Sequence, residues 1–179
     1  MHQDCERILI TADQIRERVL ALGEQITKDY HGEEVIFVSI LNGSYIFTAD
    51  LMRAVELPCQ VDFMQVSSYG DSTCSSGTLK IKRDLNSDIT GKHIIIVEDI
   101  LDTGYTMRNL INYLGSKNPR SMKICTMIDK PARRTEEVSA DYLGFVINED
   151  LFLVGYGLDY AQRYRNLPYV AILKPEIYS

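Results

Sequence analysis

The sequence predicts an α/β fold whose central sheet is mostly parallel and flanked by helices. Two apolar runs, 35–41 and 93–97, lack the alternation of a half-exposed strand and are typical of strands buried on both faces. Each run gives way to a polar stretch and then to a helical pattern of apolar residues. Strands and helices that alternate along a chain build parallel sheets, because each helix carries the chain back across a face of the sheet.

The remaining elements are predicted from the same periodicities. A helix over 11–30 has apolar side chains at spacings of three and four, with Thr11 or Asp13 as its expected N-cap. A second helix follows residue 44 and runs through Val55, and a third begins at Met107 and stops near Gly115. Further strands or apolar runs are expected at 61–66, 79–82, 122–128, 142–147, 152–156 and 169–173.

Composition restricts the class of protein. The 179 residues, 45% hydrophobic and 25% charged, fit one soluble globular domain. Acidic residues outnumber basic ones 25 to 19, which argues against a broad nucleic-acid surface. No apolar run approaches the ~20 residues that span a bilayer, and the charged N-terminus does not read as a signal peptide. The four cysteines are far apart and lack neighbouring histidines, so we expect reduced thiols in the cytoplasm and no zinc site.

An acid cluster follows the buried run 93–97. Glu98 and Asp99 come at its end and Asp102 soon after, where ligands bind in open α/β sheets. A solvated strand end is the plain alternative, but three like charges this close favour a cation or polyol partner. Adjacent strand residues point to opposite faces, so Glu98 and Asp99 are expected to bind neighbouring sugar hydroxyls or the water shell of Mg²⁺.

The next turn, Thr103–Thr106, has the composition of an anion site. Its small and hydroxyl residues open a helix, and the free backbone N–H groups at a helix N-terminus suit a phosphate. Acids for sugar hydroxyls beside amides for a phosphate together describe a ribose phosphate. The dinucleotide-binding, P-loop and nucleophile-elbow motifs do not occur. A further polar stretch over 67–78 is either a floppy hairpin tip or a mobile lid.

The segment Val97–Thr106 resembles the phosphoribosyl-diphosphate signature of type I phosphoribosyltransferases. Other segments resemble the hypoxanthine (hypoxanthine-guanine) phosphoribosyltransferase branch, and the resemblance covers about residues 10 to 173. It implies the type I phosphoribosyltransferase fold and a single domain over 1–179, with a small hood from the N- and C-terminal segments and a mobile lid at about 67–78. The matching segments are 41–44, 62–64, 67–70, 129–131, 152–160 and 164–169.

This resemblance implies a reaction of purine salvage. The 5-phosphoribosyl group of phosphoribosyl diphosphate would pass to hypoxanthine, and to guanine, giving IMP or GMP and diphosphate, with Mg²⁺ as cofactor. The resemblance also implies a homodimer or homotetramer, with neither nucleic acid nor membrane as partner. A xanthine-preferring transferase and a non-catalytic nucleotide-sensing regulator on the same fold are the alternatives. The regulator should show a basic face, whereas the net charge here is −6.

The resemblance also assigns site residues. Asp102 would take the proton from purine N7, and Lys130 would donate to the 6-oxo group. Because lysine has donors and no acceptor, adenine with its 6-amino group is disfavoured. The ribose and 5′-phosphate would be bound by Glu98, Asp99, Asp102, Thr103, Gly104, Tyr105 and Thr106. The purine would meet Lys130, Phe152, Leu153 and Asp159, the diphosphate Asn42, Gly43, Ser68, Tyr69 and Arg165, and the metal Glu98, Asp99 and Asp159.

Two positions depart from the family pattern. Asn42 stands where many relatives carry a basic residue, so diphosphate binding would be weaker unless the contact is made by backbone. Tyr105 stands where some relatives carry lysine, and there a backbone amide suffices.

Overall fold

The computed structural model describes residues 1–68 and 79–178, and the predicted lid therefore lies mostly outside the described residues. The strands are β1 (Cys5–Ile10), β2 (Val35–Leu41), β3 (Cys59–Ser68), β4 (Leu79–Arg83), β5 (His93–Leu101), β6 (Ser121–Asp129), β7 (Tyr142–Val146), β8 (Leu153–Val154) and β9 (Val170–Leu173). The helices are α1 (Ala12–Asp29), α2 (Tyr45–Ala54), α3 (Tyr105–Gly115) and α4 (Pro175–Tyr178), and a 3-10 turn spans Pro131–Arg133.

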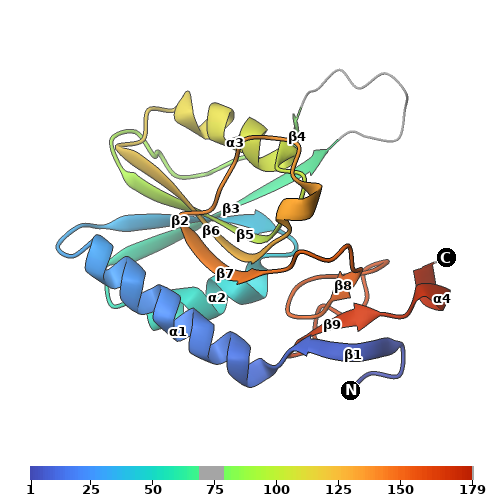
Figure 1. Cartoon of the computed structure of the whole chain (residues 1–179). Coiled ribbons are helices and arrows are strands. Elements are labelled where there is room, and N and C mark those ends of the chain that lie inside the picture. Colours follow the sequence, from blue (N-terminus) through green and yellow to red (C-terminus); the bar gives the residue numbers. More distant parts are fainter. Residues whose placement is uncertain (69–78, 179) are drawn as a thin grey trace.

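The described strands form two sheets (Figure 1). The larger has the order β4-β3-β2-β5-β6-β7, in which every pairing is parallel except β3 with β4. The smaller has the order β1-β9-β8 and is antiparallel, so it joins the two ends of the chain. The predicted mostly parallel sheet is confirmed.

Helices cover both faces of the large sheet, which explains the strands that lack alternation. In Figure 1, α1 and α2 lie below the sheet and α3 lies above it. Phe37 and Ile95 pack with α1 and α2 on one face, while Ile36, Ile94 and Ile96 pack with α3 on the other. Because both faces are buried, the apolar residues of β2 and of Ile94–Val97 in β5 follow one another without alternation.

The start of α1 follows the sequence closely. Gln14 N donates to Thr11 Oγ1 at 3.2 Å and Thr11 N donates to Gln14 Oε1 at 2.9 Å, a reciprocal capping box. Thr11, and not Asp13, is therefore the N-cap. None of the helices in the described ranges is long and apolar enough to span a membrane.

Three boundaries differ from the prediction. Strand β5 continues through Glu98 and Asp99 to Leu101, because its pairing with β6 extends to Leu101 and Asp129. Helix α3 begins at Tyr105, two residues earlier than predicted. The run 152–156 yields only the two-residue β8, because Gly155 takes a φ of 97° and turns the chain away. Glu98 and Asp99 thus belong to the strand, whereas Asp102 lies in the turn that follows it.

Candidate active site

A cavity of about 500 Å³ opens at the carboxyl ends of β2, β3 and β5. It is polar, and four segments far apart in the sequence contribute to it: the end of β2 with the following loop, the end of β3, the end of β5 with the following turn, and the pair Asp159 and Arg165. Of the predicted site residues, those that line it are Asn42, Gly43, Glu98, Asp99, Asp102, Thr103, Gly104, Thr106, Asp159 and Arg165. Ser68 ends β3 at this edge of the sheet, and Tyr69 lies outside the described residues.

Glu98 and Asp99 form a half-buried acid pair. Burial raises the pKa of Glu98 well above its ordinary value, and the charge of Asp99 raises it further. Burial also raises the pKa of Asp99, although hydrogen bonds and the charge of Arg165 oppose the shift. Asp99 Oδ1 accepts from the backbone N–H of Ile100 at 2.9 Å. Two carboxylates in this setting resist ionisation, and a cation beside them would restore both charges.

The loop after β2 lies directly on Asp99. A Cβ atom at Gly43 would overlap Asp99 Oδ2, and one at Gly157 would overlap the Gly43 carbonyl oxygen. Only glycine allows the loop to approach the Asp99 carboxylate, and the backbone at Gly157 to approach the loop, so closely. The peptide bond between Leu41 and Asn42 in the same loop is cis. Asn42 and Gly43 both line the cavity beside the acid pair.

Arg165 faces the acid pair from the C-terminal segment. Its Nη2 lies 2.7 Å from Asp159 Oδ1, and its Nη1 donates to the Gly157 carbonyl oxygen at 2.7 Å. The Arg165 and Asp159 side chains are only 18% and 25% exposed. A guanidinium fixed in this way is held in one orientation and suits a phosphate.

The turn between β5 and α3 is shaped by glycine and by an arginine that sequence reasoning missed. Gly104 is the N-cap of α3 with a φ of 86°, in the left-handed region. Arg134 donates from Nε to the Asp102 carbonyl oxygen at 2.9 Å and from Nη2 to the Leu101 carbonyl oxygen at 3.1 Å, and it pairs with Asp129. The only sequence signal was an Arg-Arg pair after Lys130-Pro131, which by itself indicates no partner.

The backbone of Lys130 is hydrogen-bonded to the residue before Asp102, and each of the two side chains lies near a group of opposite charge. Lys130 N donates to the Leu101 carbonyl oxygen at 2.9 Å, so the two residues lie at neighbouring strand ends. Asp102 Oδ1 is buried and has no hydrogen-bond donor, although Arg133 Nε lies 3.2 Å from it. The Lys130 side chain is 5% exposed, and its Nζ donates to the Leu151 carbonyl oxygen at 3.0 Å and to Asp150 Oδ1 at 3.3 Å.

The predicted purine-stacking residue has an aromatic partner of its own. The Phe152 ring stacks on Tyr178 of α4 with centroids 4.7 Å apart, and Tyr160 meets it edge-on at 5.5 Å. Leu153 is buried in β8. Lys130, Phe152, Leu153 and Tyr105 do not line the polar cavity. Tyr178 was not anticipated, because an aromatic near the chain end shows no periodic pattern.

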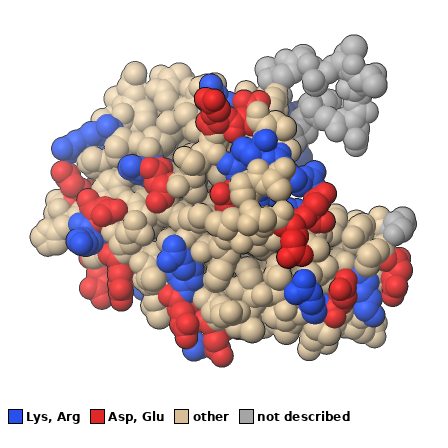
Figure 2. All heavy atoms as spheres, in the orientation of Figure 1, with Lys and Arg blue, Asp and Glu red and all other residues tan. Residues whose placement is uncertain are grey.

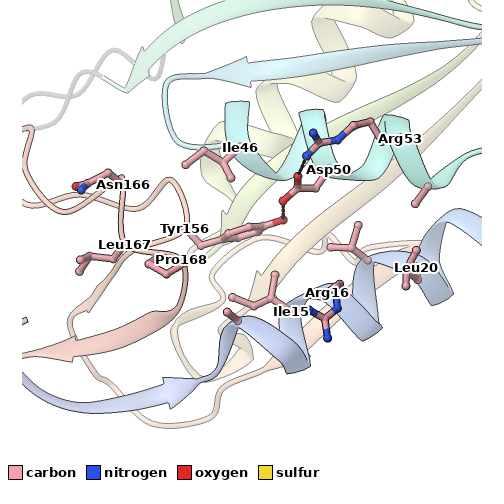
Figure 3. A pocket seen from close by; sticks show the side chains of 13 residues that line it. Ile15, Arg16, Leu20, Ile46, Asp50, Arg53, Tyr156, Asn166, Leu167 and Pro168 are labelled. Atoms are coloured by element: carbon pink, nitrogen blue, oxygen red, sulfur yellow. Dashed lines mark hydrogen bonds and ion pairs between the residues drawn. The ribbon is translucent and has the colours of Figure 1, made fainter. Parts of the chain in front are cut away.

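A second cavity, of about 520 Å³, lies between α1, α2 and residues 166–168 (Figure 3). None of the predicted site residues lines it. Tyr156 donates its hydroxyl to Asp50 Oδ2 at 2.7 Å, and Asp50 also pairs with Arg53, so the one carboxylate here is already satisfied. Its lining is mainly apolar and lacks an acid pair for a sugar.

Charge is interspersed over the surface. In Figure 2, lysine and arginine side chains alternate with aspartate and glutamate, and no broad basic area occupies the face shown. This face lacks the feature expected of a nucleic-acid-binding regulator.

Comparison with known proteins identifies the family of this chain. The family model of the phosphoribosyl transferase domain matches residues 11–161, and the chain belongs to this family. It is 46% identical over 179 residues to a hypoxanthine-guanine phosphoribosyltransferase of Streptococcus pneumoniae, covering 100% of this chain and 99% of that protein. The corresponding protein of Bacillus subtilis is 43% identical over 179 residues, again covering 100% and 99%.

A longer relative and a solved structure complete the comparison. The chain is 46% identical to the bifunctional protein TilS/HprT of Listeria monocytogenes, but it spans only 28% of that protein's length. The crystal structure of a hypoxanthine phosphoribosyltransferase from Staphylococcus aureus superimposes with a TM-score of 0.95 at 45% identity, covering 100% of this chain and 97% of that one. The predicted family and type I phosphoribosyltransferase fold are confirmed.

Proposed function

We propose that this protein transfers the 5-phosphoribosyl group of phosphoribosyl diphosphate to hypoxanthine and guanine, giving IMP or GMP and diphosphate in purine salvage. The observation that carries the proposal is the polar cavity, where an acid pair, an anion-binding turn and Arg165 converge. Lys130 at the neighbouring strand end supplies the donor for a 6-oxopurine. The relatives from Streptococcus pneumoniae and Bacillus subtilis are hypoxanthine-guanine phosphoribosyltransferases, and each matches this chain over its full length.

The sugar phosphate fits the β5 end of the cavity. Glu98 and Asp99 would accept hydrogen bonds from the ribose hydroxyls, and the backbone N–H groups of Thr103–Thr106 would bind the 5′-phosphate. Asn42, Gly43 and Arg165 would hold the departing diphosphate, together with Ser68 and Tyr69 of the predicted lid. Exclusion of water matters here, because a positively charged ribose carbon is easily hydrolysed.

The purine fits between Lys130 and Phe152. Lys130 has three N–H donors, of which two are in use, and the third would bind the 6-oxo group. Asp102 Oδ1 lacks a donor, and a purine N7–H would supply it before the proton is transferred. The Phe152 ring would stack on the base, and the Leu153 backbone and Asp159 would meet its other edge.

Mg²⁺ is the cofactor that the donor set fits. Glu98, Asp99 and Asp159 offer hard carboxylate oxygens, and the raised pKa values of the acid pair indicate a site that favours added positive charge. Within residues 1–68 and 79–178, no three acidic, histidine or cysteine side chains converge closely enough to enclose an ion. The ion would therefore be coordinated mainly by diphosphate oxygens and water, and it would neutralise the charge of the leaving group when bound.

One assay tests the activity. The protein, Mg²⁺ and phosphoribosyl diphosphate are mixed in turn with hypoxanthine, guanine, xanthine and adenine, and nucleotide formation is followed. IMP and GMP are expected, and failure to form either would refute the proposal. A rate with xanthine above both others would favour the xanthine-preferring alternative, and adenine turning over as fast as hypoxanthine would refute the role of Lys130.

Asp102→Asn tests the proton acceptor. Turnover should fall by about 10²- to 10⁴-fold because the amide takes up no proton. Binding of IMP, measured by calorimetry, should stay close to that of the wild type, because the amide has nearly the same shape. Unchanged turnover would remove Asp102 from this role.

We also propose a cytoplasmic homodimer or homotetramer, as the family resemblance implies. Light scattering on the purified protein measures the assembly. A mass equal to one chain at all concentrations would contradict it.

A further inference from the structure

Four charged side chains form one continuous chain beside the purine position. Asp102 Oδ1 lies 3.2 Å from Arg133 Nε, and Arg133 Nη1 lies 3.1 Å from Asp150 Oδ1. The same Asp150 oxygen lies 3.3 Å from Lys130 Nζ. We call this arrangement of Asp102, Arg133, Asp150 and Lys130 the charged chain. Its two inner members, Arg133 and Asp150, have no role in the reaction proposed above.

The ends of the charged chain, Asp102 and Lys130, are the two groups that would form hydrogen bonds with one edge of the purine. The 6-oxo group and N7 are neighbours on a purine, so their two protein partners must keep a fixed separation. These partners come from different strands: Asp102 follows β5 and Lys130 follows β6. The backbone bond from Lys130 N to the Leu101 carbonyl oxygen aligns the main chains. It does not by itself fix the positions of the Asp102 and Lys130 side chains.

Burial differs sharply along the charged chain. The Lys130 side chain is 5% exposed, and a buried ammonium requires acceptors, which Asp150 and the Leu151 carbonyl oxygen provide. Arg133 and Asp150 are 47% and 72% exposed, so their ion pair adds little to the stability of the fold. Instead, Arg133 orients the side chain of Asp102 and Asp150 orients that of Lys130.

We propose that Arg133 is a positioning residue that holds the proton acceptor and the 6-oxo donor in register, with Asp150 as the link to Lys130. This inference rests on the roles proposed above for Asp102 and Lys130. Without Arg133, Asp102 Oδ1 has no other partner among the described residues and its carboxylate loses its orientation. Without Asp150, the ammonium of Lys130 keeps only the Leu151 carbonyl oxygen.

The adjacent arginine has a different task, which separates the two residues experimentally. Arg134 donates to main-chain oxygens of Leu101, Asp102 and Val138, and its side chain is only 16% exposed. It shapes the turn itself, so its loss would disturb folding. By contrast, the Arg133 guanidinium pairs with the carboxylates of Asp102 and Asp150 rather than with main-chain oxygens. Its loss should therefore change kinetics and leave the fold intact.

The experiment compares four variants in steady-state kinetics, varying hypoxanthine and phosphoribosyl diphosphate separately. Arg133→Ala should lower kcat with hypoxanthine by about ten- to hundredfold, the loss expected from a slightly misplaced reacting group. Asp150→Ala should raise the KM for hypoxanthine with a smaller effect on kcat, because it acts at the Lys130 end. Both should leave the KM for phosphoribosyl diphosphate unchanged.

Arg133→Lys and Arg120→Ala complete the set. A lysine can pair with one carboxylate at a time, so Arg133→Lys should recover part of the lost kcat. Arg120 is a still more exposed arginine, 58% against 47% for Arg133, and it lies at the opposite end of β6, where it pairs with Glu33 at 3.3 Å. Arg120→Ala should match the wild type. Thermal unfolding of the Arg133 and Arg120 variants should stay near that of the wild type.

The possible results are distinct. Wild-type kinetics in Arg133→Ala or Asp150→Ala would overturn the inference, and so would an equal rise in KM for both substrates, which indicates a general structural defect. If the wild type forms IMP and Asp102→Asn loses turnover while Arg133→Ala does not, this inference alone fails. If the wild type forms no nucleotide, the proposed function itself fails.

Discussion

At the scale of single residues, the site depends on how closely backbone and carboxylates approach one another. Gly43 is the clearest case, because the Asp99 carboxylate occupies the space that a side chain would need. The contact joins the loop after β2 to the acid pair of β5 and brings main-chain groups of the loop within reach of a ligand there. A side chain at position 43 would force one of the two segments to move.

Gly43→Ala should lower the free energy of unfolding by about 1–3 kcal/mol, as overpacking does, and should raise the KM for phosphoribosyl diphosphate. Urea unfolding and steady-state kinetics measure the two effects. Gly115→Ala is the matched control, since a Cβ there would lie 3.9 Å from Met122 Cε in ordinary contact. A Gly43→Ala variant as stable and active as the control would show that the close approach has no consequence.

At the scale of elements, strand β3 is tied to the segment that leads into β5. Asp62 is 4% exposed, and its Oδ2 accepts from the backbone N–H of Asn86 at 2.8 Å and of Ser87 at 2.7 Å. Burial raises the pKa of Asp62, but the hydrogen bonds from Ser87, Phe63 and Asn86 outweigh it, so the pKa lies below its ordinary value. This carboxylate thus fastens the connection between β4 and β5.

Asp62→Asn should destabilise the protein, and the difference from the wild type should depend on pH. Because the folded-state pKa is lowered, the stabilisation is fully present above the unfolded-state pKa of about 3.9 and is lost as the pH falls through the folded-state value. The difference in free energy of unfolding between the wild type and Asp62→Asn should therefore be smaller at about pH 3 than at about pH 7. Urea unfolding at both pH values measures it. Asp13→Asn, at an aspartate whose side chain is 77% exposed, is the control. A difference that stayed constant with pH would contradict this account.

At the scale of the whole molecule, the two ends of the chain form one unit beside the cavity. Strand β1 pairs with β9, and β9 pairs with β8, which carries Leu153. Tyr164 donates its hydroxyl to Asp4 Oδ2 at 2.8 Å, next to Arg165. The N-terminal residues therefore support the segments that would bind the purine and the diphosphate.

Tyr164→Phe should reduce the free energy of unfolding by about 1 kcal/mol, the usual contribution of one hydrogen bond. Equilibrium urea unfolding measures it. Tyr45→Phe serves as the control, because Tyr45 is 44% exposed and far from the N-terminus along the chain. No difference between the two variants would mean that the bond from Tyr164 to Asp4 does not help to join the ends of the chain.

Local patterns in the sequence were sufficient for the fold and for half of the site. Buried strands, helix periodicity and the cap at Thr11 are encoded by neighbouring residues, so α1, β2 and β5 could be predicted. The segment 98–106 is likewise contiguous, and the acids and the turn it predicts do line one cavity. The end of β5 was predicted too early, because pairing with β6 outweighs the polarity of Glu98 and Asp99.

By itself, the sequence determined the α/β class, the parallel sheet and the family, since these follow from runs of residues and from motifs. Only the tertiary structure decided that Gly43 lies against Asp99, that Arg134 shapes the turn, and that Asp102 joins Lys130 through Arg133 and Asp150. Such contacts link residues that are distant in the chain and are made by ordinary charged or small side chains. Nothing local distinguishes them, because their partners are chosen by the packing of strands and loops.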